Sequence, residues 1–169
     1  MDVETAIRTR RTHKAFSPEP LERREVDELL ELARWAPNHH LTAPWRFRVV
    51  GPGALERLKR AAGPEGAAKL SRAPTLIVSS AVLSGDPLQD EEDLHATAVA
   101  SYIVLLAAHG RGLAGYWRTP ALLRDPDGQA AVGLPAGERF VGLLHLGRPR
   151  QEQAPPERPA PEQTAIYLD

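Results

Sequence analysis

Three polar clusters in the sequence combine residue types that could bind an anion. Two of them contain arginine beside a hydroxyl group: residues 10–14, which read RRTHK, and residues 117–119, which read WRT. Guanidinium groups match phosphate oxygens, and threonine hydroxyls can complete the hydrogen bonds. These clusters therefore predict a phosphate site, although a charged run such as residues 10–14 is equally typical of a solvated surface.

The third cluster is the loop at residues 36–47, which contains Pro37, Asn38, His39 and His40. Proline ends a helix and asparagine favours turns, and loops between rigid elements often carry binding groups. We therefore expect a binding surface here. Adjacent histidines rarely point at one ion and no carboxylate lies in the loop, so the sequence predicts no metal site.

The composition limits the classes of partner. Lys and Arg number 21 against 22 Asp and Glu, which gives a net charge of −1 and no global field for nucleic acid or an anionic membrane. The absence of cysteine excludes thiolate chemistry and disulfides. No apolar run reaches the roughly 20 residues of a membrane span. We expect a soluble cytoplasmic protein.

Periodicity and turn signals predict which elements position these clusters. Helices are expected at 2–9, 22–36, 54–62, 67–72, 88–109 and 121–132, and strands at 45–50, 75–83, 113–117 and 140–147. The second half of helix 88–109 is apolar nearly all round, which indicates burial against a partner subunit as well as its own domain.

The C-terminal residues differ in composition from the rest of the chain. Residues 151–163 are rich in proline and alternate in charge, which predicts an extended arm. The apolar run at 164–168 could add a strand to another subunit or remain an untethered tail.

In order and spacing, four segments resemble the nitroreductase family of flavin-dependent oxidoreductases. They are RRT at 10–12, APNHHLTAPWRF at 36–47, LLAAHGRGLAGYWRT at 105–119 and VGLLHLGRP at 141–149. The resemblance implies an α+β fold with a central antiparallel sheet flanked by helices over residues 1–150. It also implies an intertwined homodimer, with residues 151–169 packing on the partner subunit and two FMN molecules at the interface.

The resemblance gives the basic residues roles toward FMN. Arg10, Thr12 and Lys14 fall where the family contacts the flavin phosphate, ribityl chain and pyrimidine edge, and Arg11 belongs to the same run. Arg148 stands in a GRP triplet where many relatives have GTP. It is either an additional phosphate ligand or an exposed arginine.

By the same resemblance, Pro37, Asn38, His39 and His40 approach the flavin of the other subunit, and the two histidines shape its substrate face. Trp117, Arg118 and Thr119 line the phosphate end or the flavin edge. Tryptophan is mostly buried wherever it occurs, so Trp117 is alternatively a core residue.

The function implied is an NAD(P)H-dependent flavin oxidoreductase, a nitroreductase. Hydride passes from NADH or NADPH to flavin N5 and then to an electron-poor small molecule such as a nitroaromatic or a quinone, in a ping-pong scheme. The flavin carries the chemistry, so no catalytic acid or nucleophile is required. The alternative is an FMN-binding storage or sensing protein without NAD(P)H turnover. Residues 8–14 could also be read as an arm that binds nucleic acid, but the net charge of −1 argues against this interpretation.

Overall fold

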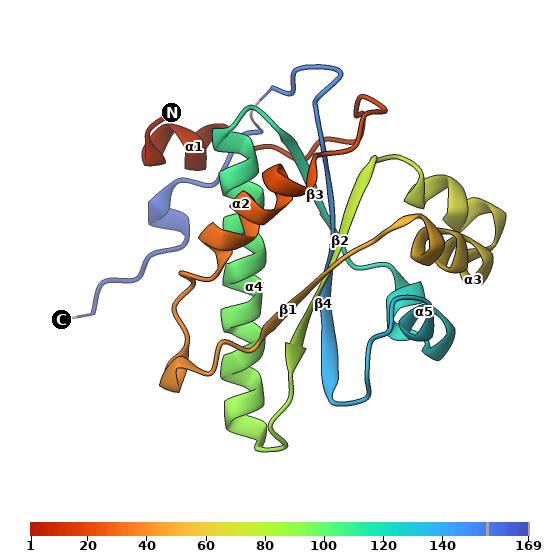
Figure 1. Cartoon of the computed structure of the whole chain (residues 1–169). Helices are drawn as coiled ribbons and strands as arrows, with labels where there is room; N and C mark the ends of the chain where they lie inside the picture. The colour runs from red at the N-terminus through yellow and green to blue at the C-terminus, as the bar shows by residue number, and fades with distance from the viewer. Residues whose placement is uncertain (155, 169) are drawn as a thin grey trace.

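An antiparallel sheet with helices on both faces forms the centre of the molecule in this computed structural model (Figure 1), which describes residues 1–154 and 156–168. The strands in this part of the chain are β1 (Trp45–Val49), β2 (Thr75–Val82), β3 (Ala114–Arg118) and β4 (Glu138–Gly147). Their spatial order is β1-β2-β4-β3, and every neighbouring pair is antiparallel. The predicted central antiparallel sheet flanked by helices is confirmed.

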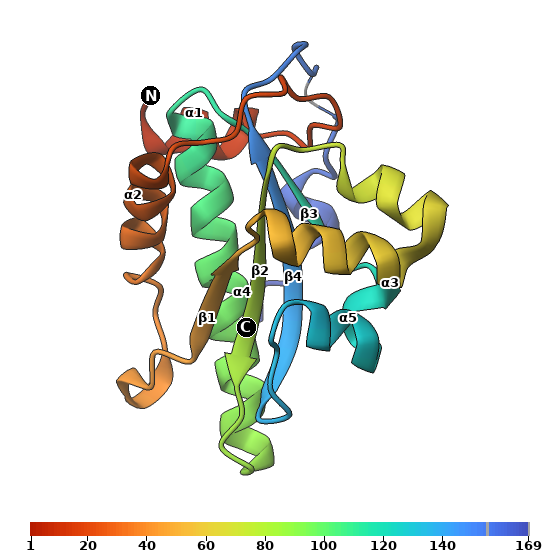
Figure 2. The same cartoon turned by 45° about the vertical axis from the view of Figure 1, so that its right-hand side comes forward.

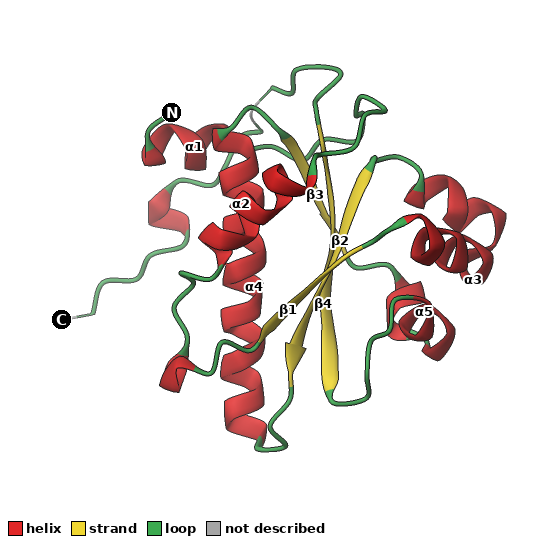
Figure 3. Ribbon diagram, viewed as in Figure 1, coloured by secondary structure: helices red, strands yellow, loops and turns green. Residues whose placement is uncertain are grey.

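The helices are divided between the two faces of the sheet (Figures 2 and 3). Helices α2 (Arg23–Ala33) and α4 (Pro87–Gly110) cover one face, while α3 (Pro52–Leu70) and α5 (Pro126–Ala131) cover the other. The short helix α1 (Val3–Thr9) lies at the C-terminal end of α4 (Figure 1). Three short 3₁₀ turns complete the described elements: η1 (His39–Leu41), η2 (Ala121–Arg124) and η3 (Pro161–Gln163).

The core forms two layers because successive strand residues point to opposite faces of the sheet. On β4, Leu144 packs with Leu29 of α2 and Val104 of α4. Its neighbour Leu143 packs on the other face with Leu58 of α3. All five leucine and valine side chains are fully buried, so the strands that carry the two layers are held from both sides.

Helix α4 is the longest described element and connects the predicted clusters. It begins after Asp86, whose carboxylate accepts a hydrogen bond from the Gln89 N–H at 2.9 Å, and it ends before Gly112, which has φ +75°. Small residues such as Ala100 pack on the sheet, whereas Val99 and Tyr102 on the outward face are 41% and 36% exposed. The apolar residues around α4 are thus only partly covered within one chain.

The helices predicted between residues 54 and 72 and between residues 121 and 132 differ in part from the structure. The single helix expected at 121–132 is wrong: η2 and α5 are separate, because Asp125 is extended and Pro126, which has no N–H, starts a new helix. The division expected at Gly63 is confirmed. Gly63 has φ +66° and breaks α3 into two helical segments, although α3 begins at Pro52, earlier than the sequence predicts.

The C-terminal arm leaves the sheet after β4. Its described residues are exposed, and Ile166 and Tyr167 are 86% and 92% exposed. The apolar run at 164–168 forms no strand within this chain. In the part of the chain that the structure describes, no helix is long and apolar enough to cross a membrane.

Candidate functional site

The first basic cluster follows α1 and runs along the end of β3. Thr12 forms a bridge with Gly115, and the His13 N–H donates to the Gly115 carbonyl at 3.1 Å. The Arg150 N–H donates to the Ala15 carbonyl at 3.3 Å, which ties the same segment to the start of the C-terminal arm. The fold therefore brings the N-terminal cluster and the arm together, although they are far apart in sequence.

Between these two segments lies a basic pocket of about 190 Å³. Its charged and hydroxyl-bearing lining residues are Arg10, Arg11, Thr12 and Arg158. Among the described residues, none of the three arginines forms an ion pair, and the buried Nε atoms of Arg10 and Arg11 have no hydrogen-bond partner. Uncompensated guanidinium groups around a small pocket fit a phosphate, whose oxygens would accept from the orphaned N–H groups.

Other contacts hold the arginines beside this pocket. The Arg11 guanidinium donates to the Arg10 carbonyl at 2.6 Å, and the Arg10 guanidinium lies 5.7 Å from the centre of the Tyr102 ring on α4. The cation–π geometry fixes the Arg10 side chain without neutralising its charge. Lys14, the remaining basic residue of the cluster, is exposed.

Two histidines lie behind the basic pocket. His13 is 8% exposed, and His109 at the end of α4 contacts the Thr9 hydroxyl through Nε2 at 2.8 Å. Burial, followed by the charge of Arg10, lowers the pKa of each imidazole below its ordinary value. The arginines rather than the histidines therefore supply the positive charge at this end of α4.

The histidine loop lies at the opposite end of α4 and has a strained backbone. His40, Leu41 and Ala43 have φ values of 54°, 53° and 45°, in the left-handed region that L residues rarely adopt. Each such residue costs roughly 1–3 kcal/mol, so the conformation persists only because its surroundings enforce it. The Asn38 side chain contributes to that enforcement, since its Oδ1 accepts from the Ala43 N–H at 2.9 Å.

Two acidic residues of α4 hold the loop from its other side. The Glu92 carboxylate lies 2.7 Å from Nδ1 of His39, and the Asp93 carboxylate accepts from the Thr42 hydroxyl, also at 2.7 Å. The His39 and His40 rings stack with their centres 3.8 Å apart. The side chains of the loop are thus ordered by contacts, while His39 remains half exposed.

A second pocket, of about 430 Å³, lies beside the loop. Its lining includes Pro37 and Asn38 together with Trp35 and Leu41, which are 74% and 85% exposed. The loop therefore presents apolar surface next to its polar groups, as a binding surface for an organic molecule requires.

The basic pocket and the histidine loop contact different parts of α4 (Figure 1). Glu92 contacts the loop and the Tyr102 ring lies against the Arg10 guanidinium, and these two residues are ten positions apart on one helix. At 1.5 Å per residue this separation is about 15 Å. The two clusters therefore line separate pockets in this chain.

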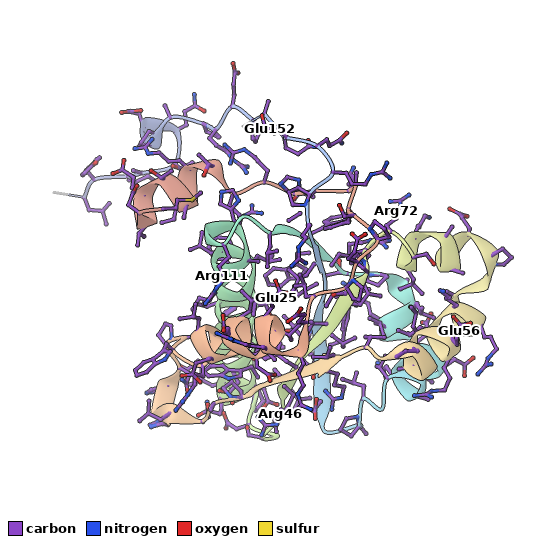
Figure 4. All side chains as sticks on the ribbon, turned by 45° about the horizontal axis from the view of Figure 1, so that its top comes forward. Glu25, Arg46, Glu56, Arg72, Arg111 and Glu152 are labelled. Atoms are coloured by element: carbon purple, nitrogen blue, oxygen red, sulfur yellow. The ribbon has the colours of Figure 1, made fainter. Side chains whose placement is uncertain are left out.

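The remaining predicted residues have other contacts in this chain. Trp117 packs against the core, and its Nε1–H lies 3.4 Å from the Val141 carbonyl. Arg118 points to the α3 side, with Nη1 3.5 Å from the Lys69 carbonyl, and the adjacent Thr119 is exposed. Arg148 forms an ion pair at 3.0 Å with Glu25 of α2, a residue labelled in Figure 4. The structure brings none of these residues into the basic pocket.

A fully buried histidine lies in the sheet, away from both clusters. His145 on β4 is opposite Tyr116 on β3, with the ring centres 5.7 Å apart, and neither ring nitrogen has a hydrogen-bond partner. Burial lowers the pKa of His145 to about 4, with a smaller contribution from Arg118. Within the described residues, no group of three His, Asp or Glu side chains could hold a metal ion.

Comparison with known proteins relates this arrangement to one family. Residues 7–69, which include the basic cluster and the histidine loop, match the model of the nitroreductase family. A Bacillus subtilis (strain 168) protein named "Putative NAD(P)H nitroreductase YfhC" is 26% identical over 165 residues, covering 88% of this chain and 84% of the relative. These matches confirm the predicted resemblance to the nitroreductase family.

Solved structures of nitroreductase relatives share the whole fold. A nitroreductase-like family protein from Bacillus cereus superposes with a TM-score of 0.89 at 26% identity, covering 100% of this chain and 97% of the other. A Desulfovibrio desulfuricans structure, described as "a putative nitroreductase in complex with fmn", has a TM-score of 0.82 at 25% identity and covers 99% and 97% of the two chains. The nitroreductase fold thus extends over the full length of this chain.

Sequence reasoning missed three residues of these two clusters. Arg158 lies in the proline-rich arm, which gave no reason to single out one charge. Glu92 and Asp93 lie in the first turns of the helix expected at 88–109, where acids are common because they suit the helix dipole. The spacing of these acids from the loop carries no signal in sequence, since only the packing of the loop on α4 brings them together.

Proposed function

We propose that the protein is an FMN-dependent oxidoreductase that transfers hydride from NAD(P)H to an electron-poor acceptor such as a nitroaromatic or a quinone. The observation that carries the proposal is the basic pocket, in which uncompensated arginines and orphaned N–H groups suit the phosphate of FMN. The relative that is described in complex with FMN, and those named as NAD(P)H nitroreductases, support this choice of cofactor and donor.

The residues of the basic pocket would hold the cofactor. Arg10, Arg11 and Arg158 would neutralise the phosphate, and the Thr12 hydroxyl would complete its hydrogen bonds. Lys14 is exposed beside them and would favour the negative charge that a flavin gains on reduction. Bound FMN would supply the redox chemistry, taking hydride from the nicotinamide and passing it to the acceptor.

Four of the predicted cofactor-binding residues are less well placed to contact FMN: Trp117, Arg118, Thr119 and Arg148. Each is engaged elsewhere in this chain or lies outside the basic pocket. We propose that Trp117 and Arg118 support the sheet beside the site and that the ion pair of Arg148 with Glu25 ties the last strand to α2.

The site is proposed to require two chains in a homodimer. The basic pocket and the histidine loop line separate pockets and contact α4 about 15 Å apart, and we propose that the loop that faces each flavin belongs to the partner. A partner packed against the partly exposed face at Val99 and Tyr102 would bring its loop toward the basic pocket. His39 and His40, with Pro37 and Asn38, would then shape the substrate face of the partner's flavin. The arm at residues 151–169 would pack on the partner.

The homodimer is tested by light scattering of the FMN-loaded protein. We expect twice the chain mass of 18.5 kDa. A folded, flavin-loaded monomer would contradict the shared site, because both clusters would then have to act within one chain. We also place the protein in the cytoplasm, a setting that suits a chain without cysteine and a nucleotide electron donor.

The activity is tested by the visible absorbance of the purified protein, followed without oxygen as NADH and then NADPH are added. We expect a flavin band that one or both nucleotides bleach and that a quinone restores. A flavin band that persists would indicate a storage or sensing protein instead. A colourless protein that does not take up added FMN would refute the proposal and leave the basic pocket to another anion.

A further inference from the structure

The contacts of the histidine loop with α4 determine which nitrogen of His39 is available. The Glu92 carboxylate can only accept a hydrogen bond, so Nδ1 of His39, 2.7 Å away, carries the proton. In the neutral ring, Nε2 is then the nitrogen without hydrogen. An exposed histidine without such a partner has no fixed tautomer and no fixed ring orientation.

The second contact fixes the loop backbone. Asp93 is 4% exposed, and its carboxylate accepts from the Thr42 hydroxyl at 2.7 Å. Thr42 lies between Leu41 and Ala43, both of which have positive φ values. A buried carboxylate that pairs with the one threonine in this strained stretch helps to hold the conformation from which His39 and Leu41 project.

We propose that Glu92 and Asp93 are positioning residues for the substrate face: they fix the tautomer and orientation of His39 so that Nε2 faces the electron acceptor. This inference rests on the proposed function. Neither acid need touch flavin or acceptor; Glu92 acts through His39, and Asp93 acts through Thr42. The neighbouring Glu91 is exposed and makes no hydrogen bond or ion pair among the described residues, so it provides a matched control on the same helix turn.

The first experiment reads the His39 tautomer by nitrogen-15 NMR under mildly alkaline conditions, where histidine is neutral. We expect the Nδ1–H form in the unsubstituted protein and in Glu91→Ala. In Glu92→Ala the resonance should shift toward the Nε2–H form that solvated histidine prefers. A His39 that has the same tautomer in all three proteins would overturn the role of Glu92. This measurement does not depend on flavin or turnover.

The second experiment measures turnover with 1,4-benzoquinone as the acceptor and compares it with flavin content. Glu92→Ala should lower kcat/KM for the quinone by about tenfold, because a contact group misplaced by about 1 Å can cost up to about a hundredfold in rate, while FMN retention stays unchanged. Glu92→Gln, which can still accept from Nδ1–H, should recover most of the loss. Thr42→Val, which removes the contact with Asp93, should resemble Glu92→Ala.

The outcomes separate this inference from the proposed function. If Glu92→Ala turns over benzoquinone as Glu91→Ala does, the positioning role is wrong and the oxidoreductase function stands. If Glu92→Ala loses flavin and activity together, the loop holds the cofactor and the positioning role is also wrong. If no variant is reduced by NAD(P)H, the proposed function fails, while the tautomer measurement still decides whether Glu92 orients His39.

Discussion

At one end of α4, His39 contacts the carboxylate of Glu92; at the other end, His13 and His109 lie beside Arg10. The same type of side chain thus has opposite electrostatic neighbours at the two ends of one helix. Near Arg10, burial and the guanidinium charge lower the pKa of both imidazoles. Near Glu92, the carboxylate instead gives the ring a defined hydrogen-bond partner.

The difference shows how one helix can serve two purposes. At its C-terminal end the histidines are kept neutral, so positive charge is concentrated on arginines whose forked donors match a phosphate. At its N-terminal end, acids that already suit the helix dipole are used again to order a strained loop. We propose that charge attracts a ligand at the first end, while charge at the second end orients side chains.

His145 is fully buried and neither of its ring nitrogens has a hydrogen-bond partner among the described residues, so its replacement should have the largest effect on the pH dependence of stability. Its pKa is about 4 in the folded protein, against an ordinary value of 6.5. The unfolded chain therefore binds more protons between these values, and stability falls as the pH falls through this range. Lowering the pH from about 7 to about 5 should cost about 2 kcal/mol through this residue alone.

The measurement is urea unfolding of the unsubstituted protein and of His145→Leu across this pH range. The leucine fills a similar volume and cannot be protonated, so the variant should lose less stability on acidification by that amount. Parallel pH profiles for the two proteins would mean that His145 is protonated as easily in the folded chain as in the unfolded one, contrary to its burial.

Replacement of Arg158 tests whether the basic pocket at the C-terminal end of α4 binds the phosphate of FMN. Arg158→Ala should weaken FMN binding by about tenfold or more, since a hydrogen bond to a charged group contributes about 1.5–3 kcal/mol. Riboflavin, which lacks the phosphate, should bind both proteins equally. Arg60→Ala, at an exposed position of α3 outside the basic pocket, is the control. An equal loss of FMN and riboflavin binding would show that Arg158 supports the fold rather than the phosphate.

The smallest expected effect concerns the backbone of the histidine loop. Ala43 has φ 45°, a conformation that β-branched residues disfavour strongly. Ala43→Val should therefore lower the free energy of unfolding by about 1 kcal/mol or more, whereas Ala43→Gly should change it by less than about 1 kcal/mol. Chemical denaturation of both variants checks this. Equal stability of the two would indicate that the loop adopts another backbone conformation in solution.

Local patterns in the sequence predicted most of the fold. The strand β2, the extent of α4 and the division of α3 near Gly63 each depend on residues close together in the chain, which is why they could be recognised. The junction of η2 and α5 was missed because apolar residues at 121–123 and 130–132 were taken to belong to one helix, although proline favours a new helix start at Pro126.

The candidate site was less predictable, because it depends on contacts between distant segments. Arg10, Arg11 and Thr12 were identified from the family motif and do line one pocket. Arg158 joins them only because the arm turns back over the N-terminal segment. Trp117 and Arg118 are adjacent on β3 and point to opposite faces of the sheet, a consequence of strand geometry that separates neighbours in sequence.

The separation of the basic pocket from the histidine loop along α4 has a genetic consequence if the proposed dimer forms. A chain that lacks Arg10 and a chain that lacks Glu92 would each form dimers in which both sites are impaired. Their mixed dimer would contain one site with Arg10 and Glu92 both intact and one site with neither. Two defective genes expressed together would then restore activity that neither provides alone.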